Sequence, residues 1–255
     1  MYDEIVSILE NKKVNDEYYK LVFSSPRLSK KVLPGQFLNI QIENHENLLL
    51  RRPFSYYRIS GNKIEVLYEI LGRGTGLLAQ KRKGHQIKVL GPLGRPFTQN
   101  IKAKKRILVA GGVGVPPLVY LAETVKNSKD QMLLIGCKSK KQVLPKKELA
   151  KVKGQVLYAT DDGSYGQKGF VTVLLHNLLK HEDPKSLFIQ TCGPTVMMNA
   201  VRKISQEFGV EGEASVEERM ACGVGACLGC VVETHDGFKT SCVEGPVFSF
   251  AALVS

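Results

Sequence analysis

The sequence lacks a long uninterrupted apolar run. Its two longest uncharged stretches, residues 107–122 and 186–201, both contain glycine and proline, whereas a membrane-spanning helix needs about 20 mostly apolar residues. Residues 1–4 also lack the basic and apolar regions that open a secretory signal. We therefore expect a cytoplasmic protein that does not enter a membrane.

Histidine is scarce, and none of the five histidines lies in a pattern typical of a nucleophile or a metal site. We expect all five to be surface or structural residues; they are His45, His85, His176, His181 and His235. Acidic residues are also few, with 24 Asp and Glu against 36 Lys and Arg, for a net charge of +12. Such an excess favours an anionic partner, and nucleic acid is the first to consider.

The positive charge is distributed unevenly along the chain. Residues 1–98 carry a net charge of +7, residues 99–210 carry +10, and residues 211–255 carry −5. No recognised nucleic-acid-binding motif accompanies the basic regions. We therefore expect no nucleic acid among the partners, and dinucleotide phosphates explain the basic regions better.

The first 98 residues have the pattern of short strands separated by turn residues. Six apolar runs, which predict a small antiparallel barrel, cover residues 4–9, 19–23, 36–42, 55–60, 63–68 and 86–90.

After residue 105 the pattern changes to alternating strands and helices, which is typical of a parallel sheet covered by helices. The expected strands are 106–110, 131–136, 155–160 and 186–191, and the expected helices are 116–126, 146–151, 170–179 and 195–208. A polar, basic stretch at 100–105 and the change to cysteine-rich sequence near residue 212 suggest two boundaries. We predict a barrel domain at 1–98, an α/β domain at 99–212 and a small cysteine-rich domain at 213–255.

Four of the six cysteines form the pattern Cys222-x4-Cys227-x2-Cys230-x11-Cys242. Clustered cysteines in a cytosolic chain favour metal binding over disulfides. This spacing is that of plant-type [2Fe–2S] proteins, whereas a four-cysteine zinc site, the competing interpretation, usually uses paired C-x2-C units. The sequence therefore favours an iron–sulfur cluster. Cys137 lies apart from this group, and we expect it to be structural.

Two glycine-containing segments could bind phosphates. Gly111-Gly112-Val113-Gly114 lies between an expected strand and helix, where backbone N–H groups can approach a pyrophosphate. Pro117 stands where the third glycine of the usual fingerprint would be, so a simple tight connection remains an alternative. Arg51-Arg52-Pro53-Phe54-Ser55 and Gly72-Arg73-Gly74-Thr75-Gly76 could together bind a second diphosphate, although an arginine pair is often only a solvated charge pair.

Several motifs together resemble the ferredoxin-NADP reductase family. They are Arg52-Pro53-Phe54-Ser55, Gly91-Pro92-Leu93-Gly94, Gly112-Val113-Gly114-Val115-Pro116-Pro117 and Cys192-Gly193-Pro194. Three further segments, which extend the likeness over the whole chain, resemble the electron-transfer subunits of class 1B, NAD-dependent dihydroorotate dehydrogenases. They are Asp162-Gly163-Ser164-Tyr165-Gly166, Glu217-Glu218-Arg219-Met220-Ala221-Cys222-Gly223 and Cys242-Val243-Glu244-Gly245-Pro246-Val247-Phe248.

The resemblance implies three cofactor sites. FAD would be held by Arg52, Pro53, Phe54, Ser55, Leu67, Tyr68, Glu69, Gly74 and Thr75. The nicotinamide dinucleotide would lie on Gly112 and Gly114, with Cys192, Gly193 and Pro194 beside the reacting ring. The cluster would be bound by Cys222, Cys227, Cys230 and Cys242, and Ser55 and Cys192 are the implied catalytic residues.

The resemblance also implies an activity and a partner. Electrons from dihydroorotate, oxidised in an FMN-containing catalytic subunit, would pass through the cluster and FAD to NAD+, for pyrimidine (UMP) biosynthesis in a heterotetramer with two copies of each subunit. A stand-alone reductase with another acceptor is the alternative. Lys138, Lys140 and Lys141 could bind the extra phosphate of NADP, although the resemblance favours NAD.

Overall fold

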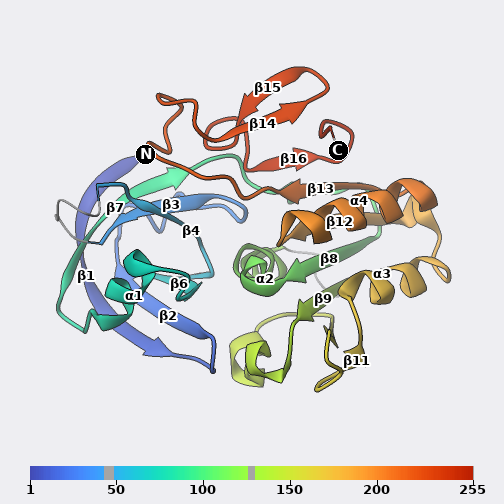
Figure 1. The fold of residues 1–255 in the computed structure, drawn as a ribbon, viewed down its shortest axis with the longest axis horizontal. Coiled ribbons are helices and arrows are strands. Elements are labelled where there is room, and N and C mark those ends of the chain that lie inside the picture. The colour runs from blue at the N-terminus through green and yellow to red at the C-terminus, as the bar shows by residue number, and fades with distance from the viewer. Residues whose placement is uncertain (43–48, 126–129, 255) are drawn as a thin grey trace.

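The computed structural model describes residues 1–42, 49–125 and 130–254 (Figure 1). His45 and the end of the expected helix 116–126 lie outside these ranges. In the described part of the chain, no helix combines the length and apolar character needed to cross a membrane.

Seven antiparallel strands form the N-terminal barrel, in the order β4-β3-β7-β1-β2-β6-β5. The helix α1 (Arg73–Gln80) lies between β6 and β7 in sequence. The strands are β1 (Tyr2–Lys13), β2 (Tyr18–Ser24), β3 (Phe37–Gln41), β4 (Arg52–Ser55), β5 (Arg58–Ser60), β6 (Lys63–Glu69) and β7 (Gln86–Leu93).

The barrel matches the expected architecture but has one strand more than the six predicted. The run 55–60 is divided into β4 and β5, because the chain leaves the strand conformation at Tyr56 and Tyr57. Both tyrosines are fully buried. Two large aromatic side chains therefore fill the interior at the point where a single continuous strand was predicted.

The second sheet has the order β11-β10-β9-β8-β12-β13-β16, with all pairs parallel except the last. Its strands are β8 (Lys105–Gly111), β9 (Gln131–Cys137), β10 (Gln155–Thr160), β11 (Gln167–Lys168), β12 (Leu187–Cys192), β13 (Glu211–Ser215) and β16 (Val247–Ser249). The helices are α2 (Val115–Thr124), α3 (Val171–Leu179) and α4 (Thr195–Phe208). The expected helix 146–151 is only a short 3₁₀ turn, Lys146–Leu149, after Pro145.

Helices cover both faces of this sheet, as the strand sequences require. Leu108 and Ala110 of β8 pack with α2, whereas Ile107 and Val109 pack with α3 and α4 on the other face. Successive side chains of a strand point to opposite faces, so a strand that is apolar throughout must be covered twice. Figure 1 shows α2 beside the barrel and α3 and α4 on the far side.

The cysteine-bearing segment, residues 216–246, leaves the second sheet and returns to it. It contains the hairpin β14 (Val231–Thr234) and β15 (Gly237–Thr240), and then β16 pairs with β13. The boundary expected after residue 212 falls inside β13. In Figure 1 the segment lies above both the barrel and the sheet.

Buried ion pairs join the barrel to the second sheet. Arg58 of β5 donates to the Glu123 carboxylate of α2 at 2.7 and 2.5 Å. Lys20 of β2 donates to Glu148 at 2.8 and 2.9 Å, and Glu65 of β6 lies beside both cations. We call Lys20, Arg58, Glu65, Glu123 and Glu148 the ionic interface; each side chain is at most 16% exposed.

Candidate functional site

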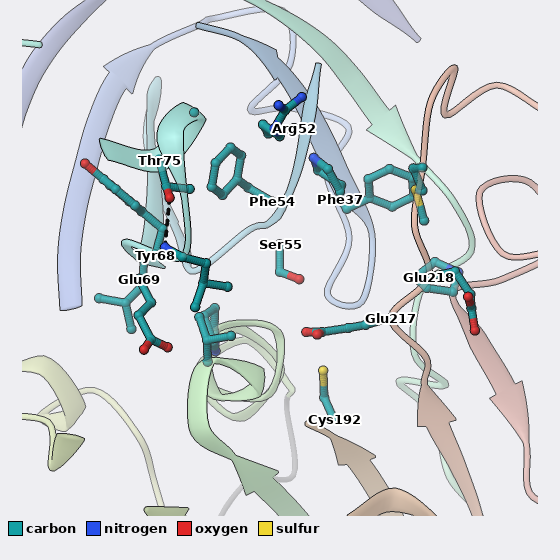
Figure 2. A pocket seen from close by; sticks show the side chains of 18 of the residues that line it. Phe37, Arg52, Phe54, Ser55, Tyr68, Glu69, Thr75, Cys192, Glu217 and Glu218 are labelled. Carbon is teal, nitrogen blue, oxygen red and sulfur yellow. Dashed lines mark hydrogen bonds between the residues drawn. The ribbon is translucent and has the colours of Figure 1, made fainter. Parts of the chain in front are cut away.

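A cavity of about 480 Å³ opens between the barrel and the second sheet (Figure 2). This volume is within the range of cofactor and small-molecule sites. All nine residues expected to hold FAD line it, from β4, β6 and the start of α1: Arg52, Pro53, Phe54, Ser55, Leu67, Tyr68, Glu69, Gly74 and Thr75.

One end of the cavity is suited to a diphosphate. Arg52 Nη1 donates to the Leu50 carbonyl at 2.6 Å, which fixes the guanidinium beside the first turn of α1. A β-carbon at Gly74 would lie 3.1 Å from Arg52 Nε, so glycine lets the helix start approach the arginine. Thr75 Oγ1 accepts from the Leu71 amide at 2.9 Å, shaping this turn. A cation and a helix N-terminus meeting at one place form an anion site, and FAD fits the residues present.

At the other end, three polar side chains come from three elements. Figure 2 shows the Ser55 hydroxyl, the Cys192 thiol and the Glu217 carboxylate facing the same part of the cavity. Burial, and secondly the nearby Glu217, raise the pKa of Cys192, so its thiol is neutral at physiological pH. Glu217 is accessible across the open cavity, yet loss of hydration among the surrounding protein atoms raises the pKa of its carboxyl.

The glycine loop after β8 packs against the end of β12. A β-carbon at Gly114 would overlap the Cys192 carbonyl, so glycine is needed for this close approach. Gly112 and Gly193 both have positive φ, and Pro194 is exposed at the start of α4. Of the five residues expected at the nicotinamide, Cys192 lines the cavity, whereas Gly112, Gly114, Gly193 and Pro194 do not. These four follow β8 and β12, at the carboxyl ends of adjacent parallel strands. Open α/β sheets bind nucleotides at this edge.

Backbone amides in the cysteine-bearing segment point at cysteine sulfurs. Cys222 Sγ accepts from the Val224 and Cys227 amides at 3.4 Å each, and Cys242 Sγ accepts from Gly225 at 3.2 Å. The Val224 amide, and then others in the loop, lower the pKa of Cys222 to about 6, whereas burial raises that of Cys242. Thiolates surrounded by N–H donors are suited to an iron–sulfur cluster.

The four cysteines differ in exposure. Cys230 and Cys242 are buried, Cys222 is half-buried and Cys227 is exposed. Among residues 1–42, 49–125 and 130–254, no three His, Cys, Asp or Glu side chains come close enough to hold a single metal ion. A [2Fe–2S] cluster is ligated by four cysteines shared between two irons, so the donor set fits that group.

The cavity and the cysteines share a wall. Phe37 and Met220 both line the cavity. The same two side chains belong to the apolar cluster that contains Leu93, Cys230 and Cys242. A group in the cavity and a group bound by the cysteines would therefore be neighbours.

Two family models match the chain. The iron–sulfur cluster binding domain of dihydroorotate dehydrogenase B matches residues 217–254, and the oxidoreductase NAD-binding domain matches residues 108–203. The electron transfer subunit of dihydroorotate dehydrogenase B (NAD(+)) from Desulforamulus reducens is 38% identical over 238 residues, which are 90% of each chain. The chain belongs to the family of dihydroorotate dehydrogenase B electron transfer subunits.

Further relatives support this membership in the electron transfer subunit family. The subunit from a Geobacillus species is 36% identical over 262 residues, covering 100% of this chain and 99% of its own. A solved structure of an NADH-dependent reduced ferredoxin-NADP oxidoreductase, from work on flavin-based electron bifurcation, has a TM-score of 0.86 and 28% identity. It covers 98% of this chain and 90% of its own. The predicted resemblance is confirmed, and the iron–sulfur family model favours a cluster over zinc.

Glu217 and Met220 lie in one of the family motifs, but the sequence alone predicts no role for either residue. Glu217 follows β13 by two residues and so stands at the carboxyl edge of the parallel sheet. That position was the available signal, because the carboxyl ends of parallel strands border the ligand crevice. Phe37 gave no comparable signal, because an apolar residue in a strand is ordinarily a core residue.

Proposed function

We propose that this chain carries electrons between the catalytic subunit of a dihydroorotate dehydrogenase and NAD+, in pyrimidine (UMP) biosynthesis. The observation that carries the proposal is the wall of Phe37 and Met220 between the cavity and the buried cysteines. When bound, the [2Fe–2S] cluster exchanges single electrons, and FAD exchanges both single electrons and hydride equivalents with nicotinamide. The chain is the oxidoreductase component that acts on NAD(H), and dihydroorotate is oxidised in the partner.

The cavity residues would bind and orient FAD and the nicotinamide. Arg52 and the first turn of α1, with Gly74 and Thr75, would hold the FAD diphosphate, while Ser55 would lie near the flavin ring. The other FAD contacts would come from Pro53, Phe54, Leu67, Tyr68 and Glu69.

Cys192 and Glu217 would border the nicotinamide. Because burial keeps the Cys192 thiol neutral, we assign it a role in packing against the ring rather than as a nucleophile. Gly112 and Gly114 would lie under the dinucleotide, and Gly193 and Pro194 would border it. This arrangement needs no acid or base from the chain, because a hydride moves between two cofactors.

We assign FAD binding to residues 1–98, NAD binding to residues 99–212 and cluster binding to residues 213–255. Cys222, Cys227, Cys230 and Cys242 would be the cluster ligands. We further place the protein in the cytoplasm. The charge of −5 over residues 211–255 separates this cluster-binding part from the two basic parts.

The catalytic partner would dock over the cysteines. The cysteine-bearing segment carries exposed apolar side chains: Val224 at 40%, Leu228 at 62%, Phe238 at 74% and Val243 at 48% exposure. Exposed apolar surface is typical of protein interaction sites, and docking here would bring the partner's FMN close to the cluster. We propose a heterotetramer with two copies of each subunit.

NAD is the proposed dinucleotide. Lys138, Lys140 and Lys141 follow β9, but the Lys140 amide donates to Ser164 Oγ at 2.7 Å, and Ser164 in turn donates to the Asp162 carboxylate at 2.6 Å. The exposed Asp162 carboxylate therefore lies beside the loop that carries the lysines, and its negative charge disfavours the extra phosphate of NADP. Steady-state rates with NADH should exceed those with NADPH, and the reverse preference would refute this choice.

The decisive experiment is to express the chain with and without a dihydroorotate dehydrogenase catalytic subunit. We expect flavin absorption, two iron and two sulfide per chain, and dihydroorotate-dependent NAD+ reduction only with the partner. A stand-alone reductase would be favoured by two results together. The isolated chain would oxidise NADH with another electron acceptor, and it would form no complex with the catalytic subunit.

A further inference from the structure

Strand β3 contains a buried amide with no partner. Its neighbours Leu38 and Ile40 face the barrel core, whereas Phe37 faces the cysteines. Asn39 shares the face of Phe37, because alternate residues of a strand point the same way. Asn39 is 0% exposed, and in the described part of the chain neither Nδ2 nor Oδ1 has a hydrogen-bond partner.

The unpartnered amide lies against the cysteine-bearing segment. A β-carbon at Gly223 would overlap Asn39 Nδ2 and would lie 3.5 Å from Leu93 Cδ1. Gly223 directly follows Cys222 and has a φ of +71°. Both the tight contact and the left-handed backbone therefore require glycine, so that the segment can rest on the Asn39 amide.

The strand pairing next to Asn39 is irregular. Phe37 pairs with Leu93 of β7, but Asn39 pairs with Leu90, so the register shifts between the two. The extra residue lies in β7, whereas β3 keeps a regular register with β4, so the alternation of side chains along β3 is preserved. The barrel thus presents the amide to the cysteine-bearing segment at the point where its own sheet is distorted.

The chemistry of the neighbouring groups identifies the missing acceptor. Amides of the segment already donate to the sulfurs of Cys222, Cys227 and Cys242 at 3.2–3.4 Å. Asn39 would add one more N–H donor, from the barrel, next to the residue that follows Cys222. Buried amides are stable when they are hydrogen-bonded, and an iron–sulfur cluster brings sulfide and thiolate acceptors.

We propose that the Asn39 side-chain amide donates a hydrogen bond to a sulfur atom of the cluster, which positions the Cys222 loop on the barrel and raises the cluster reduction potential. The proposal rests on the proposed function, since it needs the cluster. A hydrogen bond to a cluster sulfur stabilises the more negative, reduced state and so raises the potential.

The test is a redox titration of the full chain followed by electron paramagnetic resonance. Asn39→Leu keeps the approximate shape and removes the donor. We expect about a tenfold change in the one-electron equilibrium constant, a potential lower by about 59 mV. Tyr56→Phe is the matched control, because the Tyr56 hydroxyl is also buried and unpartnered but lies against Gly91. It should leave the potential unchanged.

Two outcomes separate this proposal from the proposed function. A protein without iron and flavin would defeat the proposed function. A fully loaded Asn39→Leu protein with an unchanged potential would overturn the role of Asn39 alone, and a buried water would then be the partner of the amide.

A measurement on the unsubstituted protein covers the case in which Asn39→Leu does not fold. With ¹⁵N in asparagine side chains only, pulsed electron paramagnetic resonance of the reduced cluster should show a ¹⁵N coupling. Residues 217–246 contain no asparagine, so the signal cannot come from that segment. The absence of any ¹⁵N coupling would overturn the proposal.

Discussion

The barrel meets its two neighbours in opposite ways. Against the second sheet it uses the ionic interface, in which Arg58 and Lys20 find their carboxylate partners within the chain. Against the cysteine-bearing segment it uses Phe37 and Leu93, which pack with Met220 of the segment, together with the unpartnered Asn39 amide. The first contact is complete in the polypeptide. The second needs an added group, because metal binding and folding of such a segment are coupled.

This difference separates two steps of the activity. The ionic interface fixes the barrel relative to the sheet, and hence the cavity relative to Cys192 and the glycine loop. The cysteine-bearing segment would reach its final geometry only with its cluster. We therefore expect NADH oxidation and electron transfer to the partner to be separable by substitution.

Cys230→Ser should have the largest effect. Because Cys230 is a proposed, buried cluster ligand, its loss should abolish cluster binding and dihydroorotate-dependent NAD+ reduction, while FAD content and NADH oxidation with ferricyanide remain. Iron analysis and the two assays would measure this. Cys137→Ser, in β9 away from the segment, is the control and should keep both activities. Loss of FAD in Cys230→Ser would show that the two contacts are not independent.

Arg58→Met should have the next largest effect, on stability. Removing the cation leaves Glu123 and Glu65 buried without it, and breaking a buried ion pair costs about 3–5 kcal/mol. Urea denaturation would measure the loss, and the cluster should still be bound. Lys12→Met, which removes the exposed Lys12–Glu10 pair, should cost less than about 1 kcal/mol. Equal losses in the two variants would contradict the importance of the ionic interface.

Glu217→Gln tests the cavity that lies between the ionic interface and the cysteine-bearing segment, and its effect should be smaller than that of Arg58→Met. Loss of hydration among the surrounding protein atoms raises the pKa of the accessible Glu217 carboxyl in the folded state, so the folded protein holds this proton more tightly than the unfolded chain. Stability is then lost as pH rises from about 4.3, the unfolded value, through the raised folded value. The glutamine variant should lose this pH dependence and be slightly more stable at pH 8. Slower flavin reduction by NADH in stopped-flow experiments should accompany it. An identical pH profile for both proteins would refute the shift.

Leu228→Gly should have the smallest effect. Leu228 has a φ of 55°, in the left-handed region that costs a non-glycine residue about 1–2 kcal/mol. Glycine removes this cost but gains freedom in the unfolded chain, so we expect a stabilisation of about 1 kcal/mol or less. Thermal unfolding of the loaded protein would measure it. Leu228→Ala keeps the left-handed backbone strain and removes most of the exposed side chain. A similar stabilisation in that variant would show that the exposed side chain, and not the backbone strain, is the cause.

Local sequence signals were enough for most of the barrel strands, for β8, β9, β10 and β12 at the centre of the second sheet, and for the glycine loop. They did not predict β11, β13 or β16, and the FAD-binding residues, which line the cavity, stay a prediction. The features that were predicted depend on neighbours in the chain, such as the turn residues around each apolar run and the cysteine spacing. The contacts between parts were not predictable in this way. Lys20 and Glu148 are 128 positions apart, and the contact of Asn39 with Gly223 joins opposite ends of the chain. The division of the run 55–60 likewise depends on where the core accepts Tyr56 and Tyr57.

The pairing of β13 with β16 has one more consequence. Ser215 lies opposite Val247, so the chain leaves the sheet and re-enters it at adjacent positions. Everything between them, including all four clustered cysteines, is topologically one long hairpin loop. The same loop contributes Glu217 and Met220 to the cavity. A single insertion between two neighbouring strands therefore brings both the proposed cluster ligands and part of the cavity wall, so the two would be gained or lost together.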